Sequence, residues 1–407
     1  MIRRRVHYPL LGLAVGLIGV PVTGQPESPV GVERTLVLSD LSRVPMRLVG
    51  IDGGTVRGVV DGRVQIFGPG TWAAVIGQAT FSDEGESTSE NTIRSMIELT
   101  DGQRLAGVLL SGGNGEEFWW EVAGHGILSV PLDAVRALCF DGCPDRWEQT
   151  LRDVVVLRNG DRLEGFVAAI GDRIELESAG RVLAFDPASI IRVQLAASAQ
   201  QVEGAMLWLA DGQVVRVGAF GGMEGVRFSI QPDWPGDAQS EAFKLSVRID
   251  EAVALVADAA VWAPLASLGI ERQGPVAGRR WASPVIVGEV GPAGLADLRL
   301  PGPMFVDVPL PSNARRFACE VELPEDSRLW GDCILIVQSL DRRGGEHELG
   351  RVRVHGGSPR GEINVALDGV STLRLVLDPG PGGPIQDRII LRHGVLLLGR
   401  SATVPPE

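Results

Sequence analysis

Short apolar segments separated by Asx-Gly turns recur along the first two thirds of the chain. Three copies place Asp101-Gly102, Asn159-Gly160 and Asp211-Gly212 between two apolar runs, with the turns roughly fifty residues apart. Asp-Gly and Asn-Gly favour a tight hairpin turn because they tolerate positive φ at both central positions. The pattern therefore predicts strand, turn and strand in each copy, and a tandem array of small β-modules.

Each copy continues in the same way after its turn. Gly107 and Gly165 fall inside the second predicted strand, where a missing side chain permits a bulge or a sharp bend. The copies then close on similar phrases at 131–138, 186–193 and 248–255, in each of which an acid precedes an apolar strand. The recurring residues thus have a structural explanation. A calcium role for Asp101, Asp161 and Asp211 is the alternative, but one acid per turn supplies too few oxygen ligands.

A less regular first copy is expected from Arg34 to Gly77, with Asp52-Gly53-Gly54 as its turn. The polar, acidic segment 81–92 has no apolar period and is predicted to be a linker. The expected modules are 33–80, 93–147, 150–200 and 203–260.

After residue 260 an Ala- and Pro-rich stretch, 261–279, is predicted to be a connector, and a second β-domain is expected over 280–401. Eight segments in this domain are apolar at alternate positions and bounded by Gly, Pro or Asp. They are 296–300, 304–309, 316–323, 333–340, 350–354, 362–367, 372–377 and 394–398. This number of strands in about 120 residues is typical of a jelly-roll sandwich.

Composition supports an all-β chain and limits its possible partners and cellular location. The 53 glycines and 26 prolines are spread along the sequence, which suits many short strands. A net charge of −13 argues against nucleic acid as a partner. Residues 1–24 combine arginines, a short apolar stretch and small residues before Gly24, which predicts a signal peptide and an exported protein, periplasmic, cell-surface or secreted. An uncleaved anchor is the alternative; no later segment is long and apolar enough to span a membrane.

The four cysteines form two local pairs, Cys139 with Cys143 and Cys319 with Cys333. In an exported protein such pairs predict disulfides. Cys319 and Cys333 flank a turn-like segment and are expected nearly opposite each other in a hairpin. A zinc site at Cys139 and Cys143 is the alternative, but no second Cys or His pair lies at ligand spacing.

Two resemblances follow from these residues. The repeated unit resembles the small Sm-like barrel modules found in tandem in exported bacterial proteins. The segments Phe317–Leu323, Ile334–Gln338, Gly361–Leu377 and Asp387–Leu391 resemble the NPCBM family, the novel putative carbohydrate-binding modules. That resemblance covers about residues 280–400 and implies a galactose-binding-like jelly roll attached to exported or surface proteins. Of the family's closing Asp-His-Ala-Asp-Trp phrase this chain keeps only Asp387.

Sugar sites combine an aromatic face with a few polar groups, and the C-terminal domain offers Trp281, Trp330, Asp387 and His393. Packing of each tryptophan between the sheets is the alternative; Trp330 is the better candidate because it is expected in a loop. Motifs for metal hydrolysis, nucleophilic catalysis or phosphate binding are missing from the sequence, so neither a catalytic site nor a cofactor is predicted. Two functions remain open besides a less expected glycoside hydrolase: a glycan-binding module for polysaccharide, or a scaffold that binds envelope proteins.

Overall fold

The computed structural model describes residues 31–77, 95–113, 115–122, 126–141, 150–198, 200, 202–224, 227–233, 244–276, 278–341, 345–383 and 385–400. The expected signal peptide, the linker 81–92 and Cys143 lie outside these ranges. Over the described residues the chain forms thirty-one β-strands and six short 3-10 turns, and it has no α-helix there. The predicted all-β class, small β-repeats followed by a β-sandwich, is confirmed.

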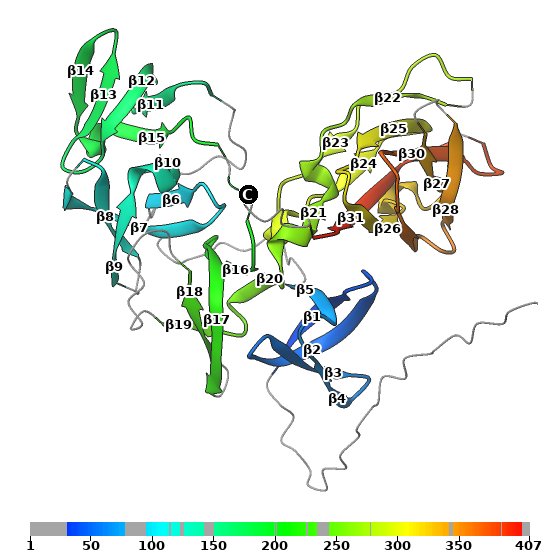
Figure 1. Ribbon diagram of the computed structural model, residues 1–407. Coiled ribbons are helices and arrows are strands. Elements are labelled where there is room, and N and C mark those ends of the chain that lie inside the picture. Colours follow the sequence, from blue (N-terminus) through cyan, green and yellow to red (C-terminus); the bar gives the residue numbers. More distant parts are fainter. Residues whose placement is uncertain are drawn as a thin grey trace, which may run out of the picture. The chain divides into compact units, whose positions relative to one another are not determined.

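Twenty strands form four groups of five, which we call the first to fourth modules in chain order (Figure 1). In each module the first strand pairs with the second and the fifth, and the second, third and fourth follow as an antiparallel meander. The first module comprises β1 (Val32–Leu38), β2 (Arg43–Asp52), β3 (Thr55–Val60), β4 (Arg63–Phe67) and β5 (Trp72–Gly77). The second comprises β6 (Ser95–Leu99), β7 (Arg104–Gly113), β8 (Glu117–Val122), β9 (Gly126–Pro131) and β10 (Val135–Cys139).

The third and fourth modules repeat this arrangement. The third comprises β11 (Asp153–Leu157), β12 (Arg162–Ala169), β13 (Ile174–Ser178), β14 (Arg181–Phe185) and β15 (Ile190–Gln194). The fourth comprises β16 (Ala205–Leu209), β17 (Val214–Glu224), β18 (Arg227–Pro232), β19 (Leu245–Arg248) and β20 (Ala252–Val256). Alternate side chains of these strands point inward, and the buried ones of all four modules form one connected hydrophobic core.

The recurring Asx residue shapes the turn between the first and second strands of each module. The Oδ1 atoms of Asn159 and Asp211 accept the backbone N–H two residues on, at 3.0 and 3.1 Å. This local bond stabilises the turn, and the following glycine adopts positive φ. In the first module Asp40 makes the same bond to Ser42 at 2.9 Å. The prediction that Asp52-Gly53-Gly54 is this turn was therefore wrong: those residues join β2 to β3, and Leu41 at φ 62° takes the glycine's place.

Gly165 allows the second strand of the third module to change partners. It pairs with Asp153 of β11, whereas the next residue, Phe166, pairs with Glu177 of β13. A Cβ atom on Gly165 would lie 2.3 Å from the carbonyl oxygen of Glu177. Gly107 is in the same situation in the second module, and the predicted bend at these glycines is confirmed.

The modules are joined in pairs by their closing strands. Strand β10 pairs antiparallel with β15, and β5 pairs antiparallel with β20, so the second module joins the third and the first joins the fourth. The two registers are equivalent, because Leu138 lies opposite Val193 and Val75 lies opposite Leu255. We call these the 2–3 junction and the 1–4 junction.

The C-terminal domain is a sandwich of two antiparallel sheets around a second core. One sheet contains β21 (Trp262–Pro264), β23 (Ile286–Val287), β24 (Leu298–Leu300), β26 (Ala314–Glu322), β29 (Arg360–Ala366) and β31 (Ile389–Leu398). The other contains β22 (Arg272–Pro275), β25 (Met304–Pro309), β27 (Asp332–Leu340), β28 (Glu346–His355) and β30 (Thr372–Pro379). All eight predicted strands are present.

Residues 261–279 are not the simple connector that the composition predicted. Strand β21 pairs with β31 and β22 pairs with β25, so this segment supplies an edge strand to each sheet of the sandwich. Strands β21 and β22 are too short to show the alternation of apolar and polar residues by which a strand is recognised in a sequence.

The predicted disulfide between Cys319 and Cys333 is wrong. Both thiols are free and buried, with Cys319 on β26 in one sheet and Cys333 on β27 in the other. The segment between them crosses from sheet to sheet instead of closing a hairpin, and burial raises the pKa of each thiol to about 12. Cys139 is disulfide-bonded.

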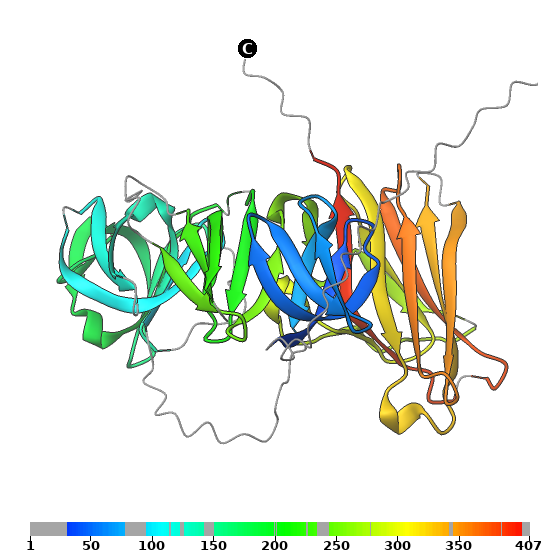
Figure 2. The same ribbon diagram turned by 90° about the horizontal axis from the view of Figure 1, so that it is seen from below.

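The sandwich packs against the outer face of the 1–4 junction. Ala74 and Val256, whose side chains point away from the module cores, form a third hydrophobic cluster with Trp262, Leu295 and Val395 of the sandwich. Both views show the end of β31 (red) beside the first module (blue) (Figures 1 and 2).

Candidate functional site

Trp330 projects from the loop that joins β26 to β27. The loop makes one 3-10 turn at Glu325–Ser327, and the Ser327 carbonyl accepts the N–H groups of Trp330 and Gly331 at 3.3 and 2.7 Å. These bonds leave the Trp330 side chain 65% exposed and the neighbouring Leu329 79% exposed. The indole is therefore presented to solvent, and the alternative that Trp330 packs between the sheets does not hold.

Asp387 contacts the end of this loop and lies two residues before β31. It is 3% exposed, and its Oδ1 accepts the backbone N–H of Asp332 at 3.4 Å, while its Oδ2 is buried without a hydrogen-bond partner. Burial raises the pKa of Asp387 to about 6, and the charge of Arg279 opposes this shift. A buried carboxyl oxygen with no partner is rare in folded proteins.

The loop and the segment around Asp387 are held together by close contacts. A Cβ on Gly331 would lie 3.1 Å from the carbonyl oxygen of Gln386, so the two backbones approach where only glycine fits. Arg388 donates to the buried Ser327 hydroxyl at 3.0 Å and pairs with Asp326 at 3.0 Å. The loop that presents Trp330 is thus fixed relative to Asp387.

Trp281 belongs to a third segment that reaches the same region. Its side chain is 74% exposed, so it too is not packed between the sheets. Two residues earlier, Arg279 is close enough to Asp387 for its charge to lower the pKa of that carboxyl. Ile385, 57% exposed, adds an apolar side chain. We call the exposed residues Trp281, Leu329, Trp330 and Ile385, together with Asp387, the Trp330 cluster.

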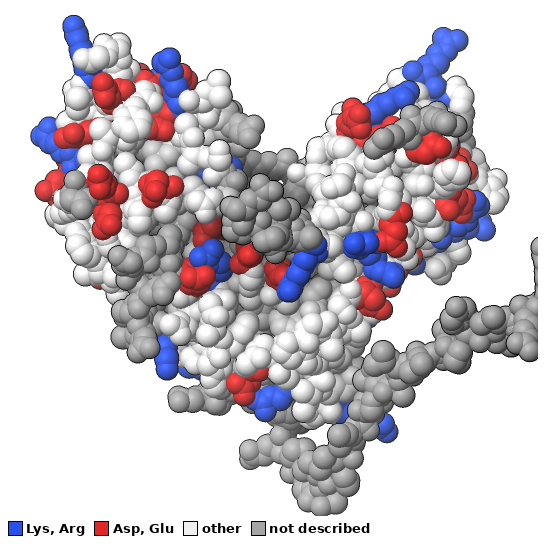
Figure 3. Space-filling view, in the orientation of Figure 1, with Lys and Arg blue, Asp and Glu red and all other residues white. Residues whose placement is uncertain are grey.

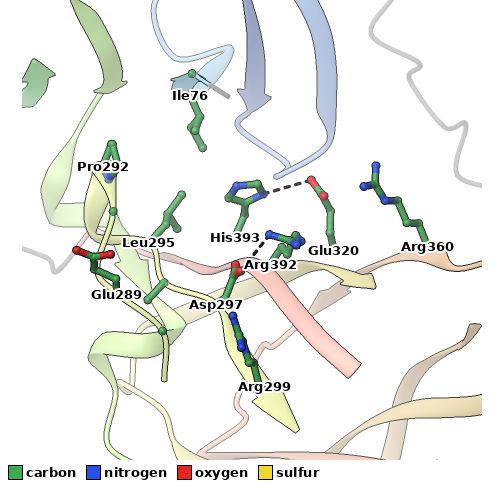
Figure 4. Close-up of a pocket in the computed structure, with 14 residues that line it drawn as sticks. Ile76, Glu289, Pro292, Leu295, Asp297, Arg299, Glu320, Arg360, Arg392 and His393 are labelled. Carbon is green, nitrogen blue, oxygen red and sulfur yellow. Dashed lines mark hydrogen bonds and ion pairs between the residues drawn. The ribbon is translucent and has the colours of Figure 1, made fainter. Parts of the chain in front are cut away.

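His393, the fourth predicted residue, lies elsewhere. It occupies the middle of β31 at φ 50° and lines a groove of about 630 Å³ between the first module and the sandwich (Figure 4). Its Nδ1 lies 3.4 Å from Glu320 Oε1, a contact drawn as a dashed line in Figure 4. Arg43 of β2 pairs with the same carboxylate and donates to the His393 carbonyl at 2.9 Å. These residues connect β2 to the sandwich.

Hydrogen bonding to His393 and the charge of Arg43 lower the pKa of Glu320 to about 2. The groove also holds Arg392, which pairs with Asp297 at 3.0 Å. Its charged groups are largely neutralised by one another, so this groove has the character of a domain interface. The structure therefore does not bring His393 together with Trp330 and Asp387.

The recurring turn acids show no sign of chemistry. Asp101 accepts the N–H groups of Gln103 from backbone and side chain, and Asp211 does the same for Gln213. Among the described residues no group of three or more His, Cys, Asp and Glu side chains is arranged to hold a metal ion. The described part of the chain also contains no helix of the length and apolarity needed to cross a membrane. Acidic and basic side chains are interspersed on the face shown in Figure 3.

Sequence reasoning missed the exposed apolar residues Leu329, next to Trp330 in the chain, and Ile385, two residues before Asp387. An apolar residue next to a tryptophan in a loop bounded by Pro and Gly was an available signal. The approach of the three loop segments could not be read from the sequence, because it depends on how the two sheets face each other.

No family model matches the chain, and no curated protein matches it either. Solved structures similar to it include the CBM51 from Clostridium perfringens GH95 in complex with methyl-galactose, at 16% identity and TM-score 0.25 over 33% of this chain and 99% of that one. The CBM22-1 xylan-binding domain from Paenibacillus barcinonensis Xyn10C matches at 15% identity and TM-score 0.21, over 34% and 99%. The tandem CBM51 modules of the family 98 glycoside hydrolase from Streptococcus pneumoniae match at 10% identity and TM-score 0.25, over 62% and 89%.

Proposed function

We propose that this protein is an exported, non-catalytic carbohydrate-binding protein and that the Trp330 cluster holds the sugar. The observation that carries the proposal is an exposed indole on a fixed loop whose backbone approaches the segment of a buried carboxyl group with an unpaired oxygen. An aromatic ring stacks on the C–H face of a sugar ring, and a carboxyl group beside it accepts a hydroxyl hydrogen bond. The NPCBM resemblance of residues 280–400 agrees with this role, and the repeats would then be Sm-like modules that support the sandwich.

The experiment measures binding of the full chain without residues 1–24 to a panel of polysaccharides that includes peptidoglycan and sulfated glycans. Isothermal titration of each hit is repeated with Trp330→Ala. Stacking is worth about 1 kcal/mol or more, so the variant should bind at least about fivefold more weakly or not at all. A segment that begins at residue 275 would not serve, because it removes β21 and most of β22 from the sandwich.

Trp119→Ala is the matched control. Trp119 is also an exposed tryptophan, 44% accessible on β8, but it belongs to the second module. Binding that survives Trp119→Ala and fails with Trp330→Ala supports the proposal. Equal binding by Trp330→Ala and the unsubstituted chain would contradict it, as would a folded chain that binds none of the glycans.

A scaffold for envelope proteins is the second candidate function. The pairing of closing strands at both junctions, together with the packing of the sandwich on one of them, favours it. This reading predicts that all glycans fail while the chain stays folded, an outcome that would leave the modules as the binding surface.

A further inference from the structure

A groove of about 860 Å³ opens beside the 2–3 junction. Its apolar wall includes Leu132 and Val135 of the second module and Phe166, Val167 and Leu195 of the third. Phe166 is 63% exposed, although it is a large aromatic residue on a strand. We call this the Phe166 groove.

The 1–4 junction contains an equivalent groove. Val135 pairs with Leu99 at the start of β10 just as Trp72 pairs with Leu38 at the start of β5. Val135 lines the Phe166 groove, and Trp72 lines a cavity of about 410 Å³ at the 1–4 junction.

The other wall corresponds as well. The N–H of Leu195 donates to the carbonyl of Arg136, and the N–H of Ala257 donates to the carbonyl of Ala73, both at 2.8 Å. Leu195 lines the Phe166 groove and Ala257 lines the cavity at the 1–4 junction. The two spaces are therefore the same feature of two equivalent module pairs.

At the 1–4 junction the sandwich supplies one wall of this groove. Trp262, Leu397, Leu398 and Arg400 line the smaller cavity, and all four belong to the sandwich or to its first strand. Trp262 is 8% exposed, and Arg400 pairs with Asp258 at 2.9 Å. The sandwich thus contributes two paired strand ends to this cavity, β21 with an aromatic residue and the end of β31 with two leucines followed by an arginine.

The Phe166 groove has the complementary charge for an occupant of this kind. Its lining includes Glu116, Glu117, Asp133 and Asp153, and no Lys or Arg among the described residues. Asp153 is used internally, because it accepts the N–H groups of Val167 and Ala196 at 2.7 Å each. The exposed Asp133, Glu116 and Glu117 lie at the rim. Glu117 accepts the Ser129 hydroxyl at 2.6 Å, and the negative charge of the rim favours a basic partner.

We propose that the Phe166 groove binds an extended segment of a partner protein that inserts an aromatic or leucine side chain and places an arginine or lysine against the acidic rim. The paired ends of β21 and β31, which border the equivalent groove at the 1–4 junction, are the internal counterpart of this partner. The interaction is separate from glycan binding, because the Phe166 groove and the Trp330 cluster share no residue.

The test selects a phage-displayed library of random dodecapeptides on the immobilised full chain, with counter-selection on Phe166→Asp. We expect enriched sequences that carry an aromatic residue or leucine within a few positions of Arg or Lys. A synthetic consensus peptide should bind the full chain at least tenfold more tightly than Phe166→Asp, and Asp133→Arg should also weaken it. Ile66→Asp, at an exposed apolar position on β4, is the matched control and should have no effect.

Three outcomes would overturn the proposal: no enrichment over Phe166→Asp, a consensus without a basic residue, or equal binding to Phe166→Asp and Ile66→Asp.

Sedimentation of the free chain tests a fourth outcome that would overturn it. A dimer that Phe166→Asp converts to a monomer would show that a second copy occupies the groove. Unchanged thermal melting of Phe166→Asp and Asp133→Arg establishes that both variants fold.

Discussion

The 1–4 and 2–3 junctions have the same strand pairing, but the side chains on their outer faces differ in polarity. At the 1–4 junction the residues that point away from the module cores are apolar, such as Ala254 and Val256, and the sandwich covers them. Arg192 and Gln194 occupy the corresponding positions at the 2–3 junction, since Arg192 pairs with Cys139 and Gln194 with Ala137. Glu98 on the same face pairs with Arg104 and Arg136. One backbone arrangement thus carries an apolar docking face for the sandwich in one place and a face with charged and polar side chains in the other.

We infer that the closing-strand side chains that point away from the module cores determine where the C-terminal domain packs. The closing strands provide identical hydrogen-bonding edges, so backbone pairing alone does not choose between the two junctions. Burial of the apolar face beneath Trp262 and Val395 favours packing of the sandwich at the 1–4 junction. Polar side chains at that place would lose their hydration without gaining hydrogen-bond partners.

Among the substitutions considered, Ala254→Arg should lower the free energy of unfolding most. Ala254 is 2% exposed within the third hydrophobic cluster, and an arginine there would bury an unpaired charge against the sandwich. We expect a loss of at least about 3 kcal/mol in the free energy of unfolding, measured by urea titration. Arg192→Ala at the matching position should change it by less than about 0.5 kcal/mol. Similar losses in both variants would show that the two faces are not different.

Gln103→Ala tests a second contact, between the second and fourth modules. Gln103 is fully buried, donates to the Asp233 carbonyl at 3.0 Å and accepts the Arg216 N–H at 3.0 Å. Gln213 returns the contact by accepting the Ala106 N–H at 3.3 Å. Removing the Gln103 amide leaves buried groups unpaired and should cost about 2 kcal/mol in thermal or urea unfolding.

Asp161→Ala is the control for that variant, because Asp161 occupies the same turn position in the third module and is exposed. Its loss should cost less than about 0.5 kcal/mol. A Gln103→Ala variant as stable as Asp161→Ala would mean that the two modules do not depend on this contact.

Asp387→Asn, in the solvent-exposed Trp330 cluster, should have a smaller effect and should stabilise the chain instead of destabilising it. Burial raises the pKa of Asp387 to about 6, above the value of about 3.9 in an unfolded chain. The protonated carboxyl therefore favours the folded state, so its contribution to stability is complete below about pH 4 and is lost as the pH rises through about 6. Asparagine should stabilise the chain at pH 7.5 by about 1 kcal/mol and remove this dependence from unfolding curves taken between pH 4 and 7.5.

Asp332→Asn is the comparison for the pH series. Two hydrogen bonds from Arg353, each 2.7 Å, lower the pKa of Asp332, so its contribution is present at neutral pH and is lost as the pH falls through the lowered value. The substitution should destabilise the chain at pH 7.5. If both variants shift stability in the same direction, the assignment of a raised pKa to Asp387 is wrong.

Much of the fold could be predicted from local pattern. The Asx-Gly turns, the glycine bends and the eight strands of the sandwich follow from short-range rules, and the structure has them. The errors at Asp52, at 261–279 and at Cys319 and Cys333 come from features with little or no period, or from a segment that crosses between sheets. In the site, exposure of Trp330 followed from its loop, whereas the unpaired oxygen of Asp387 required the packed sheets.

The order in which the modules join could not be predicted, because four equivalent edges offer several pairings. One signal was nevertheless present. The run Ala73-Ala-Val-Ile76 is apolar at every position, which indicates a strand buried on both faces, whereas Val135-Arg-Ala-Leu-Cys139 carries a charge. That contrast marks the 1–4 junction as the covered one.

Packing of the sandwich on the 1–4 junction is tested most directly by backbone hydrogen exchange on the unsubstituted chain, comparing β5 and β20 with β10 and β15. We expect protection in all four strands, because both junctions are paired, and slower exchange in β5 and β20, because the sandwich covers them. Exchange in β5 and β20 that is as fast as in β10 and β15, or faster, would contradict it.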